Sequence, residues 1–182
     1  LAREAGVKDV AVDKAIELGA KVITLSDSGG TLVHEAGISS GMLEDLMDFK
    51  NVQRGRLKDY CKQHKLKFEA DKRPWHVPVD IALPCATQNE LDGADAKHLI
   101  ANGVLCVAEG ANMPSTLEAV DHFLAAGVLY APGKASNAGG VATSGLEMSQ
   151  NAMRLAWSHS EVDLRLHEIM KNIHKACVKH GT

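Results

Sequence analysis

Three short apolar runs, each followed by a loop of small polar residues, set the strongest limit on how this chain can fold. The runs are Val79–Leu83, Gly103–Ala108 and Val128–Tyr130. Their length suits β-strands, and nearly continuous apolar character is typical of strands covered on both faces by helices. Segments with helical periodicity separate them. The pattern therefore predicts an α/β fold with a doubly wound, mostly parallel sheet flanked by helices, whose ligand lies at the carboxyl ends of the strands.

The segments around these runs extend the same pattern. A β-rich run at Lys21–Asp27, closed by Gly29 and Gly30, predicts a further strand. Apolar residues recur at helical spacing in several other segments, which we expect to be helices: 10–18, about 40–49 with Ser39 or Ser40 as cap, 52–64, 92–101, 114–124 with Pro114 in the first turn, 141–157 and 162–179. The last two would pack together as an amphipathic pair.

Composition bounds the possible partners of the chain. Of its 182 residues 45% are hydrophobic and 24% charged, and the formal net charge is −3. Nucleic-acid binding requires clustered Lys and Arg, and the sequence has no such stripe, so we expect no nucleic-acid partner. No apolar run approaches the roughly 20 residues of a membrane span, so we expect no membrane association. The four cysteines form no CxxC pair and the nine histidines form no ligand set, which predicts a reducing, cytoplasmic location and no metal site.

The loops after the expected strands carry side chains that suit a ligand. Thr87 and Gln88 follow the first run and offer neutral donors and acceptors for a ribose or a carboxamide, or else belong to a plain loop with a helix cap. Asn112 follows the second run, where its amide either holds a flat ring or closes a turn. The stretch 132–145 is denser in glycine and small polar residues than a connector requires, which favours an anion site at the start of a helix.

Three separated segments together resemble the hexameric glutamate dehydrogenases, most closely the NADP-preferring type. They read PCATQNE at 84–90, EGANMP at 109–114 and NAGGVATSG at 137–145, and the similarity covers residues 15–180. The resemblance implies that residues 1–182 belong to a dinucleotide-binding domain, incomplete at both ends, in which residues 140–182 form a helical pair leading towards an absent substrate domain. It implies a homohexameric oxidoreductase of amino-acid metabolism and nitrogen assimilation, which converts L-glutamate reversibly into 2-oxoglutarate and ammonia.

The resemblance also assigns roles to single residues. Four of them would contact the nicotinamide end of the cofactor or its ribose: Thr87, Gln88, Asn112 and Asn137. Two others, Val141 and Ser144, would form the pocket for the distal carboxylate of glutamate. A serine hydroxyl at the head of a helix suits this role, because the helix dipole favours the anion to which the hydroxyl donates.

The end of the run 21–27 indicates the type of dinucleotide. A site for NAD places an acidic residue against the ribose 2′-hydroxyl, whereas a 2′-phosphate needs neutral donors and cations. This run ends in an aspartate, but a serine follows it and a basic group comes next, so the residues that we expect to bind NADP are Ser28, Lys50 and Arg54, with Arg56 close by. The family pattern places its arginine at Gln53, which leaves NAD as the alternative cofactor. A solvated charged face is the competing interpretation of the basic group.

Two elements that the resemblance leads one to expect are missing from the sequence. The G-x-G-x-x-G turn that approaches the pyrophosphate should precede the first helix, yet residues 1–9 contain one glycine. The family's catalytic lysines and aspartate belong to the amino-terminal domain, so we expect no catalytic residue in this chain and no activity of the chain in isolation. Two alternatives remain. One is a non-catalytic nucleotide-binding or interaction module of the same fold, and the other is a related dehydrogenase for leucine, valine or phenylalanine, whose pocket would need an apolar group at Ser144.

Overall fold

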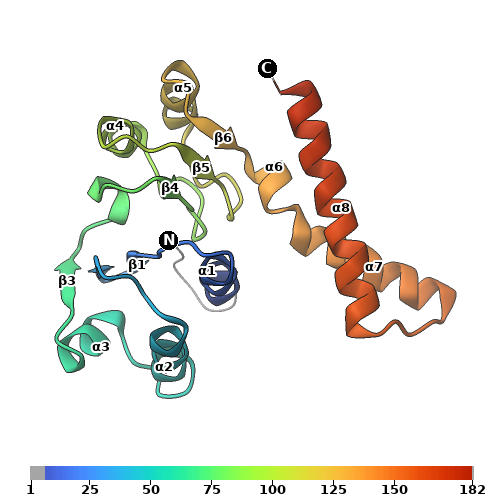
Figure 1. Ribbon diagram of the computed structural model, residues 1–182, viewed down its shortest axis with the longest axis horizontal. Helices are drawn as coiled ribbons and strands as arrows, with labels where there is room; N and C mark the ends of the chain where they lie inside the picture. Colours follow the sequence, from blue (N-terminus) through green and yellow to red (C-terminus); the bar gives the residue numbers. More distant parts are fainter. Residues whose placement is uncertain (1–6, 182) are drawn as a thin grey trace.

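The computed structural model describes residues 7–181 as an α/β body and a helical hairpin (Figure 1). Its elements follow in the order α1 (Val7–Glu17), β1 (Thr24–Asp27), β2 (Gly30–Val33), α2 (Ser40–Asn51), α3 (Leu57–Gln63), β3 (Lys67–Ala70), the 3-10 helix η1 (Pro74–His76), β4 (Ile81–Ala82), α4 (Gly93–Ala101), β5 (Cys106–Ala108), α5 (Leu117–Ala125), β6 (Leu129–Ala131), α6 (Gly133–Ser136), α7 (Ala138–Met153) and α8 (His159–His180). The α/β class expected from the sequence is confirmed.

Strands β4, β5 and β6 form the parallel sheet that the apolar runs predict. Ile81 pairs with Cys106, and Cys106 pairs with Leu129. Helices α4 and α5 connect the strands and start at residues whose side chains accept hydrogen bonds from the first turn, Asp92 and Thr116. The core of this half lies among the sheet, η1 and the two helices, and consists of Trp75, Ala82, Leu91, Ala96, Leu99, Val104, Val107, Ala119 and Phe123.

Strands β1, β2 and β3 form a separate antiparallel sheet. Leu25 pairs with Leu32, and Leu32 pairs with Phe68. The sequence predicts β1 but neither β2 nor β3. Strand β2 follows β1 directly after a tight turn, and β3 carries two charged residues among its four. The expected mostly parallel sheet is thus divided into a parallel half and an antiparallel half. The core of the antiparallel half consists of Val12, Val22, Leu25, Leu32, Ile38, Leu43, Leu46, Leu57, Tyr60 and Cys61.

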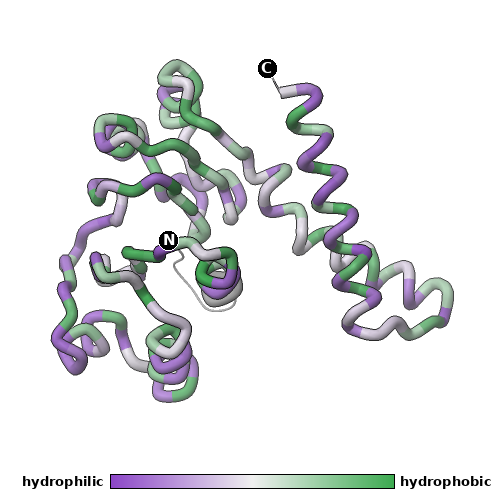
Figure 2. Tube along the Cα trace, viewed as in Figure 1, coloured by the Kyte–Doolittle hydropathy of each residue, from purple (hydrophilic) through white to green (hydrophobic). Residues whose placement is uncertain are grey.

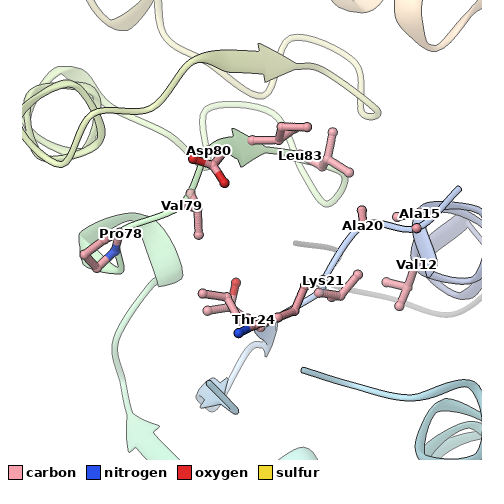
Figure 3. A pocket seen from close by; sticks show the side chains of 13 residues that line it. Val12, Ala15, Ala20, Lys21, Thr24, Pro78, Val79, Asp80 and Leu83 are labelled. Atoms are coloured by element: carbon pink, nitrogen blue, oxygen red, sulfur yellow. The ribbon is translucent and has the colours of Figure 1, made fainter. Parts of the chain in front are cut away.

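A cavity of about 570 Å³ lies between β1 and β4, the two facing edges of the sheets (Figure 3). Its walls come from α1, from the segment that leads into β1 and from the segment around β4, with Val12, Ala15, Gly19–Thr24, Pro78–Ile81 and Leu83 as lining residues. Ile81 lines this cavity and is 52% exposed. The expected burial of β4 on both faces is therefore wrong.

Helices α3 and α5 begin later than their periodicity predicts. Helix α3 starts at Leu57 instead of residue 52, because the chain first makes a turn in which Arg54 adopts a left-handed backbone with φ of 58°. Helix α5 starts at Leu117, so Pro114 lies before the helix and not in its first turn. Pro114 is fully buried, which explains why the apolar pattern continues through the loop.

Helices α7 and α8 form a hairpin that extends away from the two sheets (Figure 1). A capping box of Ser158 and Glu161 starts α8. Apolar and polar residues alternate around both helices (Figure 2), yet Ala138 is the one buried residue of α7, and α8 contains none. None of the helices in the described region has the length and apolar character needed to cross a membrane.

Candidate functional site

The loops after β5 and β6 meet through a pair of amide side chains. Asn137 donates through Nδ2 to Oδ1 of Asn112 at 2.8 Å and to the carbonyl of Ala111 at 3.1 Å. Asn137 is half-buried between α6 and α7, whereas Asn112 is exposed. The expectation that these two asparagines come together at the carboxyl edge of the parallel sheet is confirmed. Their contact with a nicotinamide stays a prediction.

Gly133 allows this close approach of the two loops. A Cβ atom at this position would lie 2.8 Å from the carbonyl oxygen of Ala111, 3.3 Å from Oε2 of Glu109 and 3.4 Å from Nδ2 of Asn137. Real Cβ contacts with backbone oxygen atoms are longer than the first of these distances, so a larger residue would push the loops apart. The amide pair therefore depends on a glycine four residues earlier in the chain.

Thr87, Gln88 and Ser28 line one cavity, which has a volume of about 350 Å³. The loop after β4 forms one side of this cavity, and the turn after β1 and the segment 71–75 form the rest. The same loop is held to the loop after β5, because the N–H groups of Asn89 and Leu91 each donate a hydrogen bond of 3.0 Å to carbonyls at 113 and 114. Thr87 and Gln88 thus lie between the Asn112–Asn137 pair and the end of β1.

The carboxylate of Asp27 at the end of β1 is occupied by donors of the protein itself. One oxygen accepts from the N–H of Gly29 at 2.9 Å, and the other accepts from the N–H of Leu57 at 3.2 Å and from Lys50 at 3.3 Å. Burial would raise the pKa of Asp27, but these donors outweigh it and hold the pKa below its ordinary value. Asp27 therefore has a structural role, in which Lys50 takes part.

The exposed hydroxyl of Ser28 lies beside Arg56. Nη1 of Arg56 donates to Oγ of Ser28 at 3.5 Å. Arg54 is also exposed, but within the described residues it makes no hydrogen bond or ion pair. The sequence pattern favours Arg54 within the basic group of residues 50–56, and the structure instead brings Arg56 to the serine. The left-handed backbone at Arg54 lies in the turn between α2 and α3, which Gly55 marks in the sequence.

Val141 and Ser144 lie on α7, which begins at Ala138, three residues earlier than predicted. Ser144 is therefore in the second turn and not at the head of the helix, and its hydroxyl donates to the carbonyl of Gly140 at 3.3 Å. Because the helix dipole acts within the first turn, the expectation that the dipole assists Ser144 as an anion ligand is wrong. Both side chains are exposed, and their role in substrate binding stays a prediction that rests on the resemblance.

Two other predictions concern absences. The prediction that residues 1–9 lack the glycine-rich turn falls largely on residues 1–6, which lie outside the described residues. Between residues 7 and 181, no group of three or more His, Cys, Asp and Glu side chains is placed to hold a metal ion. The chemistry that this site offers is therefore neutral hydrogen bonding at the ends of β5 and β6, and charged hydrogen bonding at the end of β1.

Comparison with known proteins agrees with this geometry. The family model described as Glutamate/Leucine/Phenylalanine/Valine dehydrogenase matches residues 6–182. The chain is 59% identical to the NADP-specific glutamate dehydrogenase of Escherichia coli (strain K12) over 96% of its own length and 39% of the relative's. It is 54% identical to the NAD-specific glutamate dehydrogenase of Bacteroides fragilis (strain YCH46), covering 94% of this chain and 39% of that one. The chain thus spans about two fifths of the length of these curated relatives.

Solved structures of glutamate dehydrogenases also resemble this chain. The glutamate dehydrogenase of Plasmodium falciparum superposes with a TM-score of 0.87 at 46% identity, over 93% of this chain and 36% of the other. On the combined match of sequence and structure, the chain belongs to the glutamate/leucine/phenylalanine/valine dehydrogenase family.

Proposed function

We propose that this chain is the cofactor-binding part of an NADP-dependent glutamate dehydrogenase. The reaction is the reversible oxidative deamination of L-glutamate to 2-oxoglutarate and ammonia, with hydride transfer between substrate and nicotinamide. The observation that carries the proposal is the hydrogen-bonded pair Asn112–Asn137 at the carboxyl ends of β5 and β6, in a chain 59% identical to an NADP-specific relative. An amide pair at this edge presents donors and acceptors that match the carboxamide of a nicotinamide.

The end of β1 supports the preference for NADP over NAD. The oxygens of Asp27 already accept three hydrogen bonds, so this carboxylate is poorly placed to receive a ribose 2′-hydroxyl. Ser28 and Arg56 remain exposed beside it and provide a neutral donor and a cation for a 2′-phosphate. The NAD-specific relative at 54% identity makes NAD the alternative cofactor.

In this proposal the chain binds and orients the cofactor, and proton transfer comes from residues outside it. Thr87 and Gln88 would hold the ribose, and the asparagine pair would fix the ring so that one face meets the substrate. Val141 and Ser144 on α7 would line the pocket for the distal carboxylate. Closure of a second domain over this edge would exclude water from the hydride transfer. We place the enzyme in the cytoplasm as a homohexamer, as the family resemblance implies.

An assay with the full-length protein tests the proposal. NADPH oxidation is followed with ammonia and, in parallel, with 2-oxoglutarate or with the 2-oxo acids of leucine, valine and phenylalanine. We expect turnover with 2-oxoglutarate, and a preference for an apolar 2-oxo acid would contradict the proposed substrate. The 182-residue chain by itself is the second arm. Acid–base groups contribute about 10²–10⁴ to the rate, so we expect no turnover in their absence, and activity above a buffer blank would show that they lie in this chain.

A further inference from the structure

Glu109, at the end of β5, is a buried carboxylate to which the proposed function gives no task. It is 3% exposed, although it follows a strand and stands at the edge where the two asparagine loops begin. A buried carboxylate is costly unless donors surround it, so its partners indicate what it does.

The donors to Glu109 come from three different segments. Oε2 accepts from the N–H of Gly133 in the loop after β6, at 2.8 Å, and Oε1 accepts from the N–H of Ser115 in the loop after β5, at 3.3 Å. The hydroxyl of Tyr130 in β6 also donates to this carboxylate, and burial together with that hydrogen bond raises the pKa of Tyr130. One side chain thus joins both loops to strand β6.

The backbone of Glu109 reinforces these links. Its N–H donates to the carbonyl of Ala131 at 3.0 Å, and its carbonyl accepts from the hydroxyl of Ser136. Ser136 immediately precedes Asn137, and Asn112 lies three residues after Glu109. Any displacement of this carboxylate would therefore shift both members of the amide pair relative to each other.

We propose that Glu109 is a positioning residue of the cofactor site, which sets the spacing of the Asn112 and Asn137 loops for the nicotinamide ring. The inference rests on the proposed function, because it names what holds the amide pair in place. It predicts that loss of the carboxylate harms recognition of the nicotinamide end and spares recognition of the adenosine end, which lies at β1. A purely structural role would harm both ends alike.

Glu109→Gln in the full-length protein tests this difference. The amide has the same size, but one of its ends is a donor that would face the N–H of Gly133 or of Ser115. Binding is measured by titration calorimetry with NADP⁺ and with 2′-phospho-ADP-ribose, the same dinucleotide without its nicotinamide. We expect the Kd for NADP⁺ to rise roughly ten-fold and that for 2′-phospho-ADP-ribose to change by less than about two-fold.

Two further variants complete the experiment. Glu118→Gln makes the same chemical change on the exposed start of α5 and should leave both Kd values as in the wild type. Tyr130→Phe removes one donor to Glu109 and keeps the carboxylate, so it replaces Glu109→Gln if that variant does not fold. We expect its Kd for NADP⁺ to rise about three-fold and its Kd for 2′-phospho-ADP-ribose to stay unchanged.

The outcomes separate this inference from the proposed function. If the wild type binds neither ligand, the proposed function is wrong. If the wild type binds both, and the variants of Glu109 and Tyr130 weaken both equally or neither, the positioning role is overturned while the proposed function stands.

Discussion

The two ends of the proposed cofactor site are built on different principles. At the end of β1 the exposed groups are a hydroxyl and a guanidinium 3.5 Å apart, and the charge of Asp27 is balanced by Lys50. At the ends of β5 and β6 the groups are neutral amides 2.8 Å apart, held by a buried carboxylate and by close backbone contact at Gly133. The first end tolerates movement because charges act over several ångströms, and the second depends on fixed geometry.

The largest expected effect comes from crowding the end of the site at β5 and β6, the geometric end. In Gly133→Ala the new Cβ would lie 2.8 Å from the backbone oxygen of Ala111, which cannot rotate away. Overpacking of this kind costs about 1–3 kcal/mol, and we expect the affinity for NADP⁺ and for NAD⁺ to fall together by roughly 100-fold. Calorimetric titration of both cofactors measures this.

Gly41→Ala is the matched control for that variant. Gly41 is exposed on α2, and a Cβ atom added there would meet no atom within 4 Å, so the new methyl group should leave both affinities unchanged. If Gly133→Ala binds both cofactors as tightly as the wild type, the loops after β5 and β6 adapt to the added methyl group. The geometric end of the site would then tolerate movement as the charged end does.

The end of the site at β1, the charged end, is tested by two arginines that lie close in sequence, of which Arg56 contacts Ser28. Removal of Arg56, which contacts Ser28, should cost about 1.5–3 kcal/mol in NADP⁺ binding and leave NAD⁺ binding nearly unchanged. Arg54→Ala removes the same charge from a position without such a contact, and we expect less than about 0.5 kcal/mol. Equal losses in the two variants would mean that only the net charge matters at this end.

Lys50→Ala should have a smaller effect on cofactor choice, because its ammonium group is shared with Asp27 at 3.3 Å. We expect a loss of about 1 kcal/mol for NADP⁺, little change for NAD⁺ and a small loss of stability from the unpaired aspartate. Lys58→Ala, on the exposed side of α3, provides the control. Binding is measured with both cofactors, and equal losses for NADP⁺ and NAD⁺ would remove Lys50 from the determinants of specificity.

The sequence predicts the geometric end better than the charged one, for a physical reason. Asn112 and Asn137 follow buried parallel strands, and the carboxyl ends of such strands meet at one edge whatever the details of their loops. The choice between Arg54 and Arg56 instead depends on a single left-handed residue, and the place of Ser144 depends on where α7 begins. Strand β2 follows β1 after a tight turn and β3 carries two charged residues, so neither stands out as a separate apolar run. The burial of Glu109 comes only from tertiary contacts.

The smallest expected effect concerns the pH dependence of stability at Asp27. Burial raises the pKa of this carboxyl, but the N–H groups of Gly29 and Leu57 and the Lys50 ammonium lower it overall. A folded-state pKa below the unfolded value of about 3.9 means that the ionised group stabilises the fold above that pH, and that this contribution is lost as the pH falls through the folded-state pKa. Asp27→Asn removes the contribution, which we expect to be about 1 kcal/mol.

Thermal unfolding of the wild type and of Asp27→Asn between about pH 3 and pH 7 measures this contribution. The wild type should be more stable at neutral pH, and the difference should shrink as the pH falls. A difference that stays constant with pH would show that the carboxylate of Asp27 is not held by these donors. It would then be free to receive a ribose hydroxyl, and the charged end of the site would suit NAD as well as NADP.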